Sequence, residues 1–173
     1  MKLTVLLAVL FVATPVLAQN PAPGRGAAAP AAQAEVAPPA PAPGSAAIFK
    51  SSIDLQAALK KAIAASNDMA ASPIALTDQY RVNIVHRPKA NGAIAHPGNT
   101  ELHYIIEGSG TVVTGGKIVR KPGAPASAAT IEGGESHKVT KGDVVIVPAG
   151  SAHMYSEVNG EITYLEVRFV APK

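Results

Sequence analysis

From Ile74 onward, short apolar runs rich in β-branched residues alternate with Gly, Pro, Asn and Ser. Runs of this length, separated by turn residues roughly every 8–12 positions, are typical of an all-β sandwich or barrel. The pattern therefore predicts a β domain over 74–173. The expected strands are QYRVNIVHR, ELHYIIEG, GTVVT, GKIVR, ATIEG, GDVVIVP, HMYSEV and EITYLEVRFV.

Two glycine-containing pairs predict tight turns between these strands. Gly115-Gly116 separates TVVT from KIVR, and Asn159-Gly160 separates MYSEV from EITYLEV, so each pair predicts a two-residue β-hairpin. The segment 121–129, KPGAPASAA, is too rich in Pro and Ala for a strand and predicts a loop.

The residues just before the β domain have the periodicity of a helix. In SSIDLQAALKKAIAASND, either Ser51 or Ser52 can cap the first turn, and Asp54 lies within it. The segment 48–73 is therefore expected to hold one short helix that packs on the β domain. Apolar residues recur at near-helical spacing at Ile53, Leu55, Leu59 and Ile63.

The first 47 residues have the composition of export and linker segments. Lys2 precedes an apolar run over 3–12, and Val16 and Ala18 fit positions −3 and −1 of a cleavage site. This predicts a bacterial-type signal peptide over 1–18, too short to span a bilayer. Residues 19–47 are mainly Ala, Pro and Gly with almost no large apolar side chain, which predicts a disordered linker.

Composition narrows the classes of function. No cysteine is present, which excludes disulfides and thiolate zinc sites, so any metal site must use nitrogen and oxygen ligands. The formal net charge is only +3, the basic residues are scattered and Trp is absent, so no nucleic-acid partner is expected. No later apolar run approaches membrane length. We expect an exported protein, periplasmic or secreted, with no stable membrane span after signal cleavage.

Two motifs carry the candidate chemistry. The stretch HPGNTELHYIIEGSG, residues 96–110, places His96, Glu101 and His103 within eight positions. The stretch GDVVIVPAGSAHMYSE has the spacing G-x5-P-x-G-x2-H and ends that spacing at His153. The second stretch resembles the second signature of the cupin superfamily, except that Glu157 stands where the family has Asn.

The first stretch resembles the first cupin signature, G-x5-H-x-H-x(3,4)-E-x6-G, in part. His96, Glu101 and Gly108 match its second His, its Glu and its closing Gly. Ile94 stands in place of the first His, and Pro88 in place of the leading Gly. The resemblance covers roughly 74–170 and implies a cupin-type double-stranded β-helix, or jelly-roll barrel, with a short N-terminal helix.

The resemblance also implies a metal site. His96, Glu101 and His153 would bind one divalent ion, and two imidazoles with one carboxylate also make up the facial triad of non-heme Fe(II) oxygenases. Fe, Mn, Ni, Co and Zn would all accept these ligands. The family's spread of activities includes dioxygenases, isomerases, lyases and decarboxylases, acting on small molecules. Pairing through edge strands is common among cupins, so a homodimer is one option and the oligomeric state is open.

Strand parity suggests replacements for the missing histidine. If Glu101 points into the barrel, so does His103, because residues i and i+2 share a face. His103 is therefore either an extra ligand or a general acid/base beside the metal. His86 is a second candidate ligand at the barrel rim. In QYRVNIVHR, the residues expected to face inward are Tyr80, Val82, Ile84 and His86, and those expected to face outward are Arg81, Asn83 and Arg87.

The expected pocket residues are Tyr80, Ile94, Tyr104 and Tyr155. For Tyr104 and Tyr155, packing in the core is favoured over contact with a substrate. Two classes of function stay open. One is a metal-dependent cupin with dioxygenase-, isomerase- or lyase-type chemistry. The other is a non-catalytic cupin that binds a small ligand such as a sugar, or is structural, with a degenerate metal site. Ile94 and Glu157 favour the second class.

Overall fold

The computed structural model describes residues 37–170, and the predicted signal peptide and residues 19–36 of the predicted linker lie outside this range. A single α-helix within it, α1 (Ser52–Ala64), precedes the strands. The strands in chain order are β1 (Ala70–Leu76), β2 (Tyr80–Arg87), β3 (Asn99–Thr114), β4 (Lys117–Val119), β5 (Thr130–Glu132), β6 (Glu135–Thr140), β7 (Val144–Val147) and β8 (His153–Val170). A 3-10 turn, η1 (Ala126–Ala128), lies in the predicted loop.

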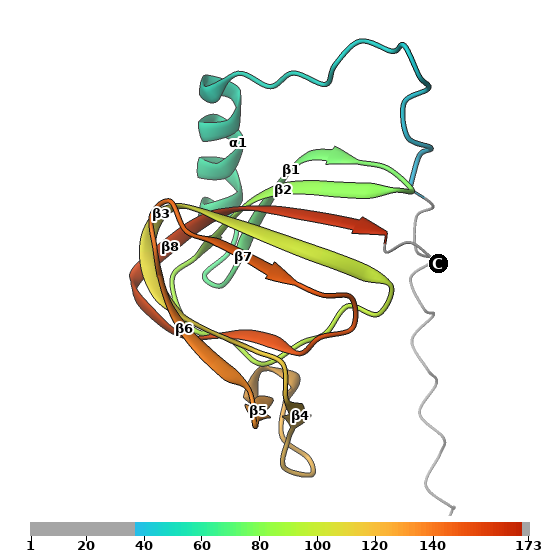
Figure 1. The fold of residues 1–173 in the computed structure, drawn as a ribbon. Coiled ribbons are helices and arrows are strands. Elements are labelled where there is room, and N and C mark those ends of the chain that lie inside the picture. Colours follow the sequence, from blue (N-terminus) through green and yellow to red (C-terminus); the bar gives the residue numbers. More distant parts are fainter. Residues whose placement is uncertain (1–36, 171–173) are drawn as a thin grey trace, which may run out of the picture. The chain divides into compact units, whose positions relative to one another are not determined.

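The strands form antiparallel sheets that curve round a common interior (Figure 1). The larger sheet has the order β1-β2-β8-β3-β6, and β7 also pairs with β3. The smaller sheet contains β4 and β5. The predicted all-β barrel with a short N-terminal helix is confirmed.

The helix begins where its cap predicts. The Ser51 side chain accepts a hydrogen bond from the Asp54 amide, and the helix starts at the next residue after Ser51. The helix lies beside β1, yet it has no buried residue, and Ile53 is 77% exposed. Within residues 37–170, no helix is long and apolar enough to cross a membrane.

The barrel begins earlier than the apolar pattern predicts. β1 starts at Ala70, inside the segment expected to be helical, and its sequence AASPIAL has little β propensity. It can be a strand because it lies at the edge of the sheet, where Pro73 needs no donor for the ladder. The register with β2 shifts between Pro73 and Ala75.

Two predicted hairpins are wrong. Asn159-Gly160 lies inside β8, where Val158 pairs with Gly110 and Ile162 with Gly108 across a register shift. The turn-like pair is therefore part of a bulge in a continuous strand. Gly115-Gly116 does connect β3 to β4, but β4 pairs with β5.

The hairpin predicted at Gly115-Gly116 does not form because both edges of β3 are already paired at its C-terminal end, where the chain continues to β4. Thr114, the last residue of β3, pairs with Glu135 of β6 on one side and His153 of β8 on the other. No free edge remains for β4. The strand β6 was not predicted because its sequence ESHKVT is polar, and Val139 is its one buried residue.

A compact apolar cluster lies in the interior of the barrel. It consists of Val85, Ile105, Val112, Val139, Tyr155, Ile162 and Tyr164. The predicted parity of β2 is wrong, because Asn83 and Val85 face this interior while Ile84 and His86 lie on the opposite face. Both faces of β2 are covered at that end of the strand, so buried polar residues break the alternation on which the prediction rested.

Candidate metal centre

The register of three neighbouring strands places polar side chains on one interior face. Residues directly opposite one another share a face of the sheet. Across β3 and β8, Glu101 lies opposite Arg168 and His103 lies opposite Glu166. On the other side of β8, Asn83 of β2 lies opposite Glu166. These paired residues form a buried charged layer, which lies next to the apolar cluster on the same interior face.

Two histidines from outside this layer lie next to Glu101. His96 lies in the loop before β3, and its carbonyl oxygen accepts hydrogen bonds from the Asn99 and Gly150 amides. His153 is the first residue of β8, and its backbone is bridged to Ile94 by two hydrogen bonds. These backbone contacts fix the main-chain positions from which the two imidazole side chains extend.

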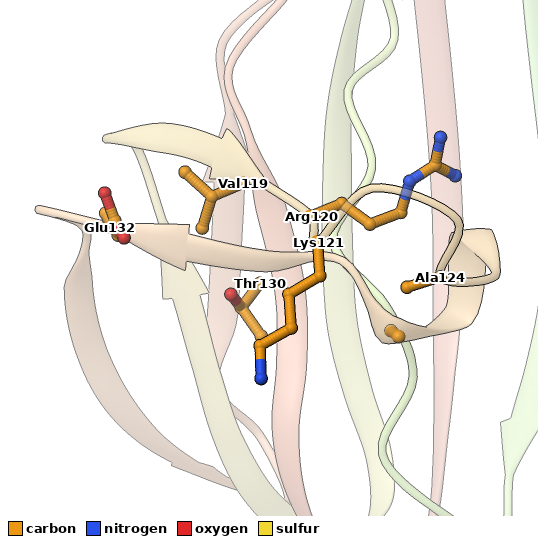
Figure 2. A pocket seen from close by; sticks show the side chains of 7 residues that line it. Val119, Arg120, Lys121, Ala124, Thr130 and Glu132 are labelled. Carbon is orange, nitrogen blue, oxygen red and sulfur yellow. The ribbon is translucent and has the colours of Figure 1, made fainter.

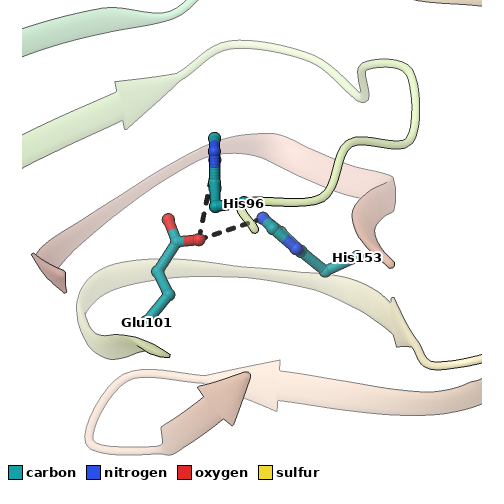
Figure 3. A group of neighbouring side chains, drawn as sticks. All are labelled: His96, Glu101 and His153. Carbon is teal, nitrogen blue, oxygen red and sulfur yellow. Dashed lines mark ion pairs between the residues drawn. The ribbon is translucent and has the colours of Figure 1, made fainter. Parts of the chain in front are cut away.

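One oxygen of Glu101 faces both imidazoles. Glu101 Oε2 lies 3.1 Å from His153 Nε2 and 3.8 Å from His96 Nε2. The dashed lines in Figure 3 join this oxygen to the two imidazoles. The two rings are 5.4 Å apart between centroids. Glu101 is only 2% exposed, whereas the side chain of His96 is 27% exposed. The cluster is therefore reached from solvent on the His96 side.

The hydrogen bonding of these atoms is incomplete. His96 Nε2 and Glu101 Oε2 are buried and have no hydrogen-bond partner. His153 Nδ1 donates to the Ser151 carbonyl oxygen at 3.2 Å, since a carbonyl can only accept. A neutral His153 then presents the lone pair of Nε2 to a carboxylate oxygen, which is also an acceptor. A cation or a proton is needed between them.

The other oxygen of Glu101 is held by donors. Glu101 Oε1 accepts from Arg168 Nε at 3.1 Å and lies 3.2 Å from His103 Nε2. Arg168 Nη2 also donates to Glu166 Oε2 at 3.0 Å, and Asn83 Nδ2 donates to Glu166 Oε1 at 2.8 Å. This network fixes the carboxylate so that Oε2 remains directed at the two histidines.

Electrostatics favour the ionised carboxylate and the neutral imidazole. Burial raises the pKa of Glu101, but the hydrogen bond from His103 and the charge of Arg168 outweigh it and hold the pKa well below the usual range. Burial and the charge of Arg168 lower the pKa of His96 below 6.5, although Glu101 partly opposes them. At neutral pH these two residues are in the states that a metal ion requires of its ligands.

A family model described as Cupin matches residues 80–161, a range that contains His96, Glu101 and His153. Residues 80–161 are a cupin domain. This confirms the family resemblance inferred from the two motifs. No curated protein matches the chain.

Several solved structures are similar to the chain at low identity. A predicted oxalate decarboxylase from Thermotoga maritima is 18% identical, with 60% of this chain and 81% of that chain covered and a TM-score of 0.43. A cupin superfamily protein from Desulfitobacterium hafniense DCB-2 is 16% identical, with 61% and 81% covered and a TM-score of 0.44. The Co(II) form of HppE in complex with substrate is 14% identical, with 60% and 53% covered and a TM-score of 0.47.

His103 does not join the group of His96, Glu101 and His153. Its Nδ1 lies 3.1 Å from the Tyr155 hydroxyl and its Nε2 contacts the opposite oxygen of Glu101. Both ring nitrogens are therefore engaged on the side of Glu101 that faces away from the two other histidines. His103 and Glu101 form a second buried group with Glu166, not with the first.

His86 lies on the other face of the sheet. Its Nδ1 is 3.2 Å from Thr163 Oγ1, and Thr163 adjoins Tyr164, which faces the apolar interior. The structure does not bring His86 to Glu101. His137 is half exposed and pairs with Glu135 at the surface.

The four expected pocket residues separate into two pairs. Ile94 lies directly opposite the first residue of β8, next to the histidine cluster, and Tyr155 is buried against His103. Tyr104 is 42% exposed and lies on the outer face, because its neighbours in β3 face inward. Tyr80 lines two surface pockets beside residues of the predicted linker. The core packing favoured for Tyr155 agrees with its place in the core cluster. The core packing favoured for Tyr104 is wrong, because its side chain is on the exposed face.

The partners of the Glu101 carboxylate were missed. Glu166 and Arg168 share a face with Tyr164 in EITYLEVRFV, and this alternation of polar residues in an apolar strand was the one available signal. A hollow of about 570 Å³ lies elsewhere, between β4, β5 and the loop that joins them, and Arg120, Lys121 and Glu132 line it (Figure 2). None of the clustered histidines lines it.

Proposed function

We propose that this chain is an exported cupin that binds a divalent metal ion through His96, Glu101 and His153 and acts on a small molecule. The supporting observation is that His96 Nε2 and Glu101 Oε2 are buried without hydrogen-bond partners and lie beside His153 Nε2. Burying such atoms unsatisfied is costly, so the arrangement favours a cation that all three atoms can bind.

The donor set fits a transition-metal ion. Ligands about 2.1 Å from one ion and at right angles to each other are about 3 Å apart. Glu101 Oε2 lies 3.1 Å from one imidazole nitrogen and 3.8 Å from the other. Three protein ligands leave open positions on a six-coordinate ion, and Fe, Mn, Co, Ni or Zn suit this nitrogen and oxygen set.

The metal, when bound, would supply a Lewis acid with open positions for an oxygen atom of a substrate. The protein would keep Glu101 ionised and oriented, through Arg168 and His103. His103 has both ring nitrogens engaged, so its proposed role is to position Glu101 instead of exchanging protons with a substrate. Dioxygenase- or isomerase-type chemistry is the class of activity that this site favours.

Metal analysis of the purified chain tests the proposal. After expression in medium supplemented with the five metals, we expect close to one equivalent in the wild type and a loss of most of it in His96→Ala and His153→Ala. His137→Ala is the matched control, because His137 is half exposed and pairs with Glu135. Less than about a tenth of an equivalent in the wild type, unchanged in His153→Ala, would contradict metal binding.

The alternative is a non-catalytic cupin that binds a small ligand, or a structural one. It is favoured by Ile94, which places an apolar side chain opposite His153 where the family has a histidine. In this case a proton would lie between His153 and Glu101. Thermal unfolding with metals, and then with sugars, carbonyl compounds and phenols, separates the two. Stabilisation by a ligand without metal dependence or turnover supports the alternative.

Export is a separate part of the proposal. It rests on the sequence of residues 1–18. We expect the chain expressed in a bacterium to reach the periplasm or medium with Gln19 as its first residue, and a chain lacking 2–18 to stay in the cytoplasm. Cell fractionation and N-terminal sequencing measure both outcomes.

A further inference from the structure

Arg87, at the end of β2, is a buried cation without an acidic partner. It is 6% exposed, and its Nε donates to the Tyr164 hydroxyl at 2.7 Å. Among residues 37–170, no carboxylate forms an ion pair with it, and its Nη1 is buried with no hydrogen-bond partner. A buried guanidinium in this state is incompletely compensated.

Nearby tyrosines offset the charge only in part. Burial raises the pKa of Tyr164 to about 12, although Arg87 opposes this, so the phenol that accepts from Arg87 is neutral. The guanidinium carbon lies 5.5 Å from the ring centre of Tyr155 and 5.8 Å from that of Tyr164. Cation–π attraction of this kind does not replace the hydrogen bond that Nη1 lacks.

Arg87 is one of the residues that line a pocket with the features of a binding site. The pocket is about 340 Å³ and is lined also by Asn91, Lys89 and Asp68. Lys89 forms an ion pair with Asp68, which neutralises its charge. The Asn91 Oδ1 atom is a second buried atom without a hydrogen-bond partner. The pocket therefore offers one uncompensated cation and one free acceptor.

This pocket is separate from the candidate metal centre. In the sheet, Arg81 lies opposite Arg168, and Arg168 lies opposite Glu101. Arg87 lies six residues further along β2, which is about 20 Å at roughly 3.3 Å per residue. The pocket shares no lining residue with the histidine cluster.

We propose that the pocket beside Arg87 binds a small oxyanion, either a carboxylate or a phosphate. The Arg87 guanidinium donates to the anion, and the Asn91 side chain accepts from a hydroxyl group that the same ligand carries. Guanidinium groups bind both kinds of oxyanion strongly where water is excluded. The proposal is independent of metal binding.

Thermal unfolding of the purified chain tests this site. The probes are phosphate, acetate and glycolate, each compared with chloride at equal ionic strength, with EDTA present so that anions bound to a metal do not contribute. We expect at least one oxyanion to raise Tm saturably by about 2 °C or more. A larger effect of phosphate identifies a phosphate ligand, and a larger effect of the carboxylates identifies a carboxylate. Because glycolate adds one hydroxyl to acetate, it should bind more tightly.

Two variants and a control locate the effect. Arg87→Met should lose the shift, whereas Lys121→Met, which removes a cation from a different pocket, should keep it. Asn91→Asp places a carboxylate in the pocket and should raise Tm without added anion and abolish the response. If Arg87→Met does not fold, the response of Asn91→Asp to the anions still tests whether they bind in this pocket. No saturable difference from chloride, or a wild-type response in Asn91→Asp, would overturn the proposal.

Discussion

At the scale of single residues, Glu101 divides its two oxygens between different tasks. Oε1 is bound by Arg168 and His103, and Oε2 faces His96 and His153. The first pair of contacts determines where the second oxygen lies. A change at either oxygen should therefore affect both the stability of the barrel and the affinity of the proposed metal site.

Glu101→Gln should destabilise the protein at pH 7 by about 3–5 kcal/mol, because it removes a buried charge and leaves Arg168 with one partner fewer. It should also abolish metal binding. Urea denaturation and metal analysis measure the two effects. Glu135→Gln, at the exposed ion pair with His137, should change stability by less than about 1 kcal/mol. Equal losses in the two variants would contradict the structural role of Glu101.

Tyr155→Phe tests the contact between the Tyr155 hydroxyl and His103, the residue that in turn contacts Glu101. Burial raises the pKa of Tyr155, so its hydroxyl is protonated and can donate to His103 Nδ1. Without that donor a buried nitrogen is unsatisfied, which costs about 1–3 kcal/mol. Metal affinity should fall about 10–100-fold, as is typical for partners of ligand residues. Titration with Co(II) measures the affinity.

Tyr104→Phe is the matched control for this loss, since Tyr104 is exposed on the outer face of the same sheet. Its metal affinity should equal that of the wild type. If Tyr155→Phe also binds metal as the wild type does, His103 does not position Glu101.

At the scale of elements, the long strands β3 and β8 determine the site. Their register places Arg168 opposite Glu101 and Glu166 opposite His103, and it shifts at three points along the pair. Two of these shifts flank Gly108. Its φ is +81°, and an added Cβ would lie 2.0 Å from the Glu161 carbonyl oxygen. A side chain there would force the two strands apart.

Gly108→Ala should therefore cost more than about 3 kcal/mol, because it combines backbone strain with a clash against main-chain atoms. Gly98→Ala separates the two causes. Gly98 has the same φ of +81° but nothing within 4 Å of an added Cβ, so about 1–2 kcal/mol of strain is expected. Urea denaturation measures both. Similar costs in the two variants would mean that the close approach of β3 and β8 is unimportant.

Sequence patterns predict the parts of this site that depend on local spacing. His96, Glu101 and His153 were found because each lies in a motif with fixed distances to glycines and prolines. The partners Glu166 and Arg168 were not found, because their contacts depend on how β8 aligns with β3 across register shifts. Burial of Asn83 was missed for a related reason, since its acid partner lies 83 positions away.

At the scale of the whole molecule, acid should destabilise the fold. The folded-state pKa values of His96 and Glu101 both lie below their unfolded values of about 6.5 and 4.5. The unfolded chain therefore binds more protons in this range, and stability falls as the pH decreases. The contribution of His96 is lost first, as the pH falls below 6.5, and that of Glu101 is lost below about 4.5.

Urea denaturation of the metal-free protein between pH 7.5 and pH 3.5 measures this dependence. Wild-type stability should fall steadily over the range. Glu101→Gln should start lower and lose less below about pH 4.5, because it has no carboxylate to protonate. A wild-type profile that is flat, or that rises toward acid, would contradict the assignment.

The pairing of β3 with β8 also bears on the order of events during folding. It joins Glu101 to Arg168, which are 67 positions apart, so a long loop must close before the charged layer exists. Domains dominated by such distant contacts fold slowly, in milliseconds to seconds. His96 and Glu101 are near each other in the chain from the start, but His153 reaches them only when β8 docks. A metal ion would therefore meet the complete set of ligands as one of the last steps in the maturation of the protein.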